Sequence, residues 1–151
     1  MDQQLILQPV VCMMLLTCAV WAFMYMRRLS FVLGNNIDPQ SIATPELKRS
    51  MLPASINNSS NNLKNLFELP VVFYALCAFL LIAQKVDAIF LYSAWTFFGF
   101  RAVHSLIHCT VNVVYFRFTA YFFASIVLWF MDCTLTNHCS RRCRGGSQSL
   151  D

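Results

Sequence analysis

Four stretches of the chain consist almost entirely of apolar residues, and polar segments separate them. They cover about residues 5–26, 63–83, 88–108 and 118–135. Each is close to the ~20 residues that a helix needs to cross the hydrocarbon core of a bilayer. A segment inside lipid must satisfy its own backbone hydrogen bonds, so each is expected to be an α-helix. The pattern predicts an all-α integral membrane protein, a four-helix bundle that crosses the membrane four times.

The polar segments predict how these helices are connected. Residues 33–62 are rich in Pro, Asn and Ser and are expected to form the one long loop. Residues 84–87 make a very short turn, so the second and third helices should be antiparallel neighbours. We therefore expect one membrane domain over residues 1–136 and a disordered polar tail over residues 137–151.

Composition agrees with a membrane location. Hydrophobic residues make up 58% of the 151 residues and charged residues 12%, whereas soluble domains are about 45–50% apolar. A soluble fold of this size has too little interior to hide so much apolar surface, which argues against a very apolar soluble bundle.

The net charge of +4 comes mainly from cations beside the apolar stretches. Lipid headgroups and the positive-inside rule explain this placement better than nucleic acid does. Arg27, Arg28, Lys48 and Arg49 favour a cytoplasmic long loop, with both termini on the other side, although the arginines of the tail argue for the reverse.

Polar residues inside the apolar stretches are the most informative feature. On the second predicted helix, Asn61, Asn65 and Glu68 are spaced i, i+4, i+7, which places them on one face. The third predicted helix has a longer polar face. That face contains Arg101, His104, Ser105, His108 and Asn112.

The depths of these residues can be compared. At 1.5 Å per residue, Glu68 lies about 7 Å along the second predicted helix from its start. The third helix ends at the same side of the membrane, and from that end His104 lies about 9 Å and Arg101 about 13 Å along the helix. An unpaired ion near the centre of a membrane helix costs about 2.5–3.5 kcal/mol, so both faces should point inward. With Arg117 and Tyr121 at the start of the fourth helix, we expect one polar pocket at the cytoplasmic side. The alternative is a buried ion pair that only fixes helix register.

Other kinds of site are less well supported. His104 and His108 have the i, i+4 spacing of metal ligands on a helix, with Glu68 as a possible third ligand. The chain has only three His, and no Cys fits this position, so no metal site is predicted. The sequence also has no Gly-rich phosphate loop and no nucleophile elbow.

Two segments of the chain resemble the MAPEG family, the membrane-associated proteins in eicosanoid and glutathione metabolism. The first is Lys64-Asn65-Leu66-Phe67-Glu68-Leu69-Pro70, and the second runs from Arg101 to His108. Asn112 and Arg117 add to the resemblance. The resemblance covers about residues 5–135 and has the character of the bacterial-type branch. It implies a homotrimer of four-helix subunits that binds glutathione between neighbouring subunits at the cytoplasmic side.

The resemblance also implies roles for individual residues. Arg117 would be catalytic, because it matches the arginine that stabilises the glutathione thiolate. The other positions would bind glutathione. They are Arg28, Lys64, Asn65, Glu68, Arg101, His104, His108 and Tyr121. The chemistry agrees, since Arg and Lys suit the carboxylates of glutathione and Glu suits its amine. A thiol also needs a nearby cation to become a nucleophile at neutral pH.

These features favour a membrane-bound glutathione-dependent transferase or peroxidase that acts on lipophilic electrophiles, in the endoplasmic reticulum or a bacterial inner membrane. The alternative is a non-catalytic family member that binds a lipid or a partner, because His108 replaces a Tyr of the synthases and Phe118 a Ser. A channel or transporter subunit is a third reading. The expected absence of a broken helix argues against it.

Overall fold

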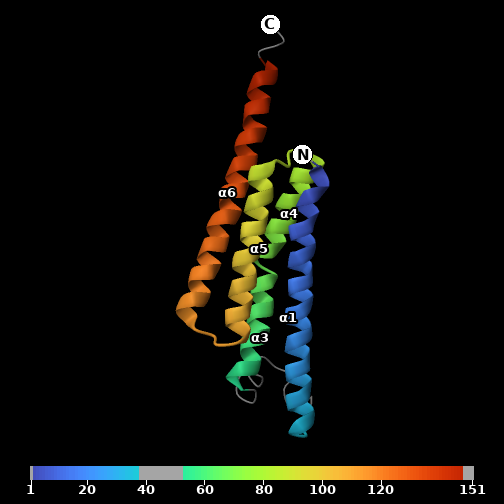
Figure 1. Ribbon diagram of the computed structural model, residues 1–151, viewed down its shortest axis with the longest axis vertical. Helices are drawn as coiled ribbons and strands as arrows, with labels where there is room; N and C mark the ends of the chain where they lie inside the picture. Colours follow the sequence, from blue (N-terminus) through green and yellow to red (C-terminus); the bar gives the residue numbers. More distant parts are fainter. Residues whose placement is uncertain (1, 38–52, 148–151) are drawn as a thin grey trace.

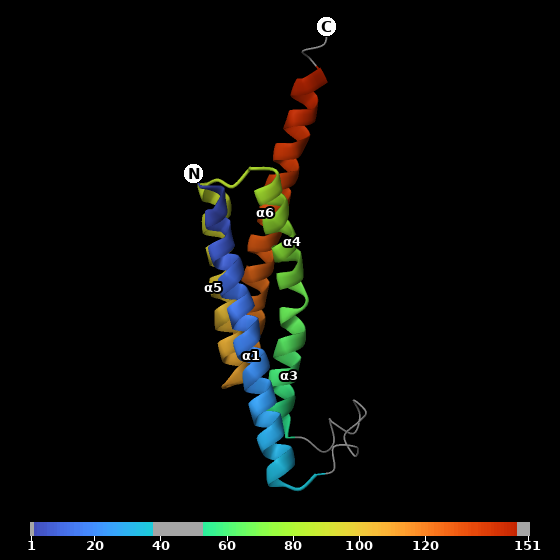
Figure 2. The ribbon, with the colours of Figure 1, turned by 90° about the vertical axis from the view of Figure 1, so that its right-hand side faces the viewer.

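The computed structural model describes residues 2–37 and 53–147, and this part of the chain is all helix and turn, without a strand. The elements are the short 3-10 helix η1 and five α-helices. They are η1 (Gln3–Ile6), α1 (Leu7–Gly34), α3 (Ala54–Leu66), α4 (Leu69–Ile82), α5 (Ala88–Cys109) and α6 (Val114–Ser147). The helices lie side by side along one axis (Figures 1 and 2). The predicted all-α fold is therefore confirmed.

The chain runs back and forth along this axis. The N-terminus and the α4–α5 turn lie at one end of the bundle, and the α5–α6 connection lies toward the other end (Figure 1). The side-chain amide of Gln3 bonds to the backbone of Val86 in both directions, with Val86 N to Gln3 Oε1 at 2.8 Å and Gln3 Nε2 to Val86 O at 3.2 Å. These bonds tie the start of the chain to the short turn. The prediction that the second and third helices are antiparallel neighbours is correct, since α3 packs on α5 and Phe73 of α4 stacks on Phe97 of α5.

The predicted long loop is shorter than expected, because helix continues on both sides of it. α1 extends to Gly34, and α3 begins at Ala54 instead of near residue 63. α3 buries Ile56, Ser59 and Leu66 on one face, which packs against α1 and α5. This tertiary contact stabilises a helix whose Asn and Ser content predicts a loop. Lys48 and Arg49 lie outside the described residues.

The C-terminal segment also differs from the prediction of a disordered tail. The backbone of α6 is helical through Ser147, and this helix extends beyond the other helices (Figure 1). Residues 137–144 contain neither Pro nor Gly, so no helix breaker occurs before Gly145. Residues 148–151 lie outside the described part of the chain.

Three helical segments in the described ranges are long and apolar enough to cross a bilayer, and the protein is a multi-pass membrane protein. They are Gln3–Gly34, Asn58–Ile82 and Val114–His138. The predicted crossing by α5 is not among them, since Arg101, His104 and His108 lower the hydropathy of its C-terminal half. The fourth crossing stays a prediction, although α5 packs along α6, α1 and α3.

The interior of the bundle is tightly packed, and its outer surface carries many large apolar side chains. Phe73 of α4 stacks on Phe97 of α5 with ring centroids 4.6 Å apart, and both side chains are fully buried. Trp21, Phe79 and Trp129 are among the large apolar side chains that point outward. Because lipid solvates such side chains as well as a protein core does, this surface fits a bilayer.

Candidate functional site

The helical segment that contains the Asn65 motif is interrupted in the middle. α3 ends at Leu66, Phe67 and Glu68 form a turn, and α4 starts at Leu69. Pro70 has no backbone N–H to donate to the carbonyl one turn earlier, and its ring crowds that carbonyl. The argument that no helix is broken was therefore wrong. The interruption releases backbone acceptors next to the predicted site.

Arg101 uses one of these released acceptors. Its Nη2 donates to the backbone carbonyl of Asn65 over 2.6 Å, and its guanidinium carbon lies 5.5 Å from the ring centroid of Tyr121. The side chain is 0% exposed, and its Nε and Nη1 have no hydrogen-bond partner. A buried guanidinium with two unused donors favours an anionic ligand.

Glu68 lies near this group but does not bond to the two free nitrogens of Arg101. The Glu68 carboxylate lies close enough to Arg101 for their opposite charges to attract, and it lies beside the Tyr121 hydroxyl. Its side chain is exposed. The structure therefore places Glu68 and Arg101 close together, as their depths suggested. The direct hydrogen bond of Arg101 goes to Asn65 instead.

Arg117 lies at the start of α6, beside the end of α5. Its Nη1 donates to Asn112 Oδ1 over 2.8 Å and to His108 Nε2 over 3.2 Å. Asn112 has φ 50, a left-handed conformation that Asn tolerates well, in the tight connection between the two helices. The connection thus holds the Arg117 guanidinium against the polar face of α5.

His104 connects Arg117 to the ring of Tyr121, over which Arg101 lies. Its Nδ1 lies 2.9 Å from the backbone carbonyl of Arg117 and must donate, because a carbonyl only accepts. Its ring centroid lies 5.7 Å from those of His108 and Tyr121. His104 Nε2 and His108 Nδ1 are buried without a partner in another residue. The ring nitrogens add unused polar atoms to the same site.

The structure brings together six of the predicted site residues in one connected group. They are Asn65, Arg101, His104, His108, Arg117 and Tyr121. Two others are less closely involved. Lys64 is exposed, and Arg28 makes no hydrogen bond or ring contact with another described candidate, although α1 packs against α3 and α5, which carry several of them.

A second polar group lies beside the first, and its central residue, Asn62, is one that the sequence did not single out. Asn62 is 0% exposed, accepts from Ser105 Oγ over 3.4 Å and donates to Cys109 Sγ over 3.4 Å. The predicted inward residue Asn61 is exposed instead. Helical spacing alone could not separate these neighbours, because the packing of α3 on α5 decides which one faces inward.

The chemistry of the site is that of a cationic cluster. Among the described residues, the group contains two guanidinium groups and two imidazoles, and the Glu68 carboxylate lies close to one of them, Arg101. No group of three or more His, Cys, Asp or Glu side chains in residues 2–37 and 53–147 is placed to hold a metal ion. The arrangement is suited to an anion that carries hydrogen-bond acceptors and one amine.

Comparison with known proteins gives one family. The model of the MAPEG family matches residues 6–134. No curated protein and no solved structure gives a significant match to the chain.

Proposed function

The chain belongs to the MAPEG family, membrane proteins of glutathione and eicosanoid metabolism, and from this premise we propose that it is a membrane-bound glutathione-dependent transferase or peroxidase acting on lipophilic electrophiles. One observation carries the proposal. Arg117 is fixed by Asn112 and His108 in the same connected group as a second, fully buried arginine, Arg101, whose Nε and Nη1 are unused. A purely structural arginine would be expected to use its donors within the fold.

The residues present fit glutathione. The Nε and Nη1 donors of Arg101 suit a carboxylate, and the exposed Glu68 carboxylate beside Tyr121 suits the amine. When bound, glutathione supplies a thiol whose thiolate form is the nucleophile. Arg117 would stabilise that thiolate from the N-terminus of α6, where the helix dipole also favours an anion. The lipophilic acceptor would arrive from the bilayer.

The assembly and placement of the site belong to the same proposal. We expect a homotrimer, with glutathione held between subunits at the cytoplasmic side. In its own subunit, Arg28 lies on a helix that packs mainly on α3, α4 and α5 and not on α6, the helix that carries Arg117. Arg28 would therefore reach the glutathione bound in an adjacent subunit. The membrane would be the endoplasmic reticulum or a bacterial inner membrane.

A thermal shift measurement with glutathione tests the proposal. A ligand that binds only the folded state stabilises it by about 2.7 kcal/mol at a hundredfold excess over Kd. We expect the Tm of the detergent-purified protein to rise with glutathione concentration, and S-methylglutathione, which lacks the thiol proton, to give a similar rise. No response at millimolar glutathione would overturn the proposal and favour a non-catalytic lipid- or partner-binding protein.

A further inference from the structure

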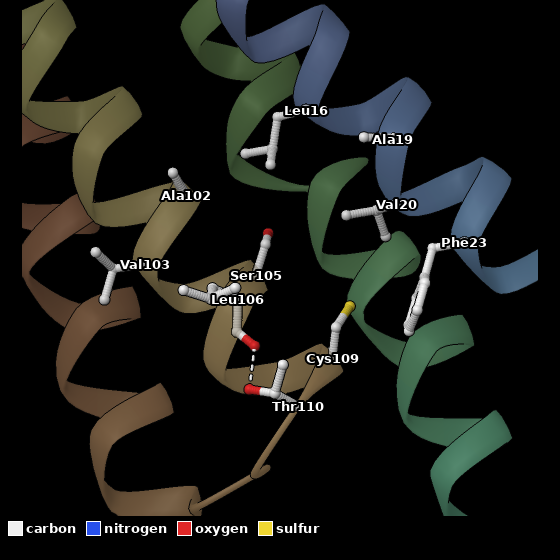
Figure 3. A pocket seen from close by; sticks show the side chains of 10 residues that line it. All are labelled: Leu16, Ala19, Val20, Phe23, Ala102, Val103, Ser105, Leu106, Cys109 and Thr110. Carbon is white, nitrogen blue, oxygen red and sulfur yellow. Dashed lines mark hydrogen bonds between the residues drawn. The ribbon is translucent and has the colours of Figure 1, made fainter.

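An open apolar groove lies between α1 and α5, on a different side of α5 from the candidate site. Its volume is about 610 Å³. α1 contributes Leu16, Val20 and Phe23, and α5 contributes Ala102, Leu106 and Cys109 (Figure 3). The surface is almost entirely apolar, and its two groove residues Ser105 and Cys109 bond to Asn62 behind it. An apolar groove of this kind inside a membrane-spanning protein fits a hydrocarbon chain.

The groove has a cation at one end. On α1, Leu16, Val20, Phe23 and Arg27 are spaced i, i+4, i+7 and i+11, so they lie along one face. The Arg27 guanidinium carbon lies 5.4 Å from the centroid of the Phe23 ring, over the wall of the groove. Along α1, the wall from Leu16 to Phe23 is about 10 Å long before this cation is reached.

Among the described residues, this end of the bundle is cationic. The described segments 27–37, 54–66 and 109–117 contain no Asp or Glu, whereas they contain Arg27, Arg28, Lys64 and Arg117. Arg27 therefore has no carboxylate partner among the described residues near it. An apolar groove that ends at such a cation complements a molecule with a hydrocarbon chain and an anionic head.

We propose that the α1–α5 groove binds an anionic phospholipid of the bilayer, with an acyl chain along Leu16, Val20 and Phe23 and the phosphate at Arg27. The lipid would be distinct from glutathione and from its acceptor, because the polar face of α5, with Arg101, His104 and His108, points toward α3 and α6 rather than into the groove. A second copy of the chain would bring its own cations against Arg27, which makes it a poorer occupant.

Native mass spectrometry of the purified full-length protein tests the site. The probes are phosphatidylglycerol and phosphatidylcholine with the same acyl chains, and free oleate. We expect phosphatidylglycerol to bind more tightly than phosphatidylcholine, and Arg27→Gln to weaken phosphatidylglycerol by about fivefold, the contribution of one basic residue near a membrane surface. The matched control Lys85→Gln removes a cation from the opposite end of the bundle and should leave the preference unchanged.

A variant that fills the groove tests the apolar contribution to lipid binding separately from the contribution of the Arg27 charge. Ala19→Phe should weaken binding of both phospholipids, whereas Ala83→Phe, on an exposed position at the end of α4, should not. Unchanged helical circular dichroism shows that each variant is folded. Three results would each overturn the proposal. They are equal affinity for the two phospholipids, an Arg27→Gln variant that binds phosphatidylglycerol as tightly as the unmodified protein, and oleate that binds as tightly as phosphatidylglycerol. A change of oligomer mass in Ala19→Phe without loss of lipid would also overturn it, since the groove would then be a subunit interface.

Discussion

Arg117 and His108 share a hydrogen bond at the junction of α5 and α6, and Asn112 in the connection supplies a second acceptor. Neither acceptor carries a negative charge. The positive charge of Arg117 is therefore not neutralised by its partners, and it is available to an anion that binds beside it. The two acceptors position the charge without cancelling it.

Replacing Arg117 by Ala should lower kcat/KM for glutathione conjugation of a lipophilic aryl halide by about a hundredfold or more, the usual cost of removing one preorganised charge-stabilising donor. Steady-state kinetics of the detergent-purified protein measures this. Lys85→Ala, which removes a cation from the far turn, is the matched control and should retain activity. Full activity in Arg117→Ala would show that the catalytic assignment is incorrect.

Among the secondary-structure elements, the interruption between α3 and α4 has the largest effect on the candidate site. It frees the carbonyl of Asn65, and Arg101 then anchors to that carbonyl from α5. A continuous helix would return this carbonyl to the backbone amide of Leu69. The position of the buried guanidinium therefore depends on a break that Pro70 imposes from the next helix.

Pro70→Ala should reduce this break, because Ala restores the missing N–H and fits a helix interior about 3 kcal/mol better than Pro. We expect slower amide hydrogen exchange over residues 66–71 and a smaller Tm increase with glutathione, since Arg101 loses its acceptor. Pro53→Ala, at the exposed start of α3, is the control. Faster exchange, or an unchanged response to glutathione, would contradict this role of the interruption.

The subunit as a whole does not gather all the predicted binding residues. Arg28 lies on α1, which packs mainly on α3, α4 and α5, whereas Arg117 lies where α5 meets α6. In the proposed trimer, a site would combine Arg117 of one subunit with Arg28 of another. Assembly would then complete a site that a single bundle leaves open.

Mixed trimers test this arrangement. Arg28→Ala and Arg117→Ala subunits, each expected to be poorly active alone, should regain activity when they are co-expressed, because some interfaces then contain both intact arginines. The activity of the separately tagged and co-purified protein is the measurement, and native mass spectrometry checks the trimeric mass. Co-expressed protein no more active than a mixture of the separate variants would contradict a shared site.

The sequence by itself determined the membrane class, the helical content and the polar face of α5. Arg101, His104 and His108 point inward as their spacing predicted, because one uninterrupted helix carries them and its period fixes their direction. The same reasoning failed on the preceding segment. The break at Phe67 and Glu68 changes the helical phase, so a single period could not be extended from Asn61 to Glu68.

Only the tertiary structure decided the remaining features. Packing of α3 on α5 buries Asn62 instead of Asn61 and keeps an Asn-rich segment helical. The α1–α5 groove beneath Arg27 also depends on how two distant segments meet. Periodicity reports the direction of a side chain about its own helix axis, whereas the neighbour that this side chain meets is set by contacts between helices.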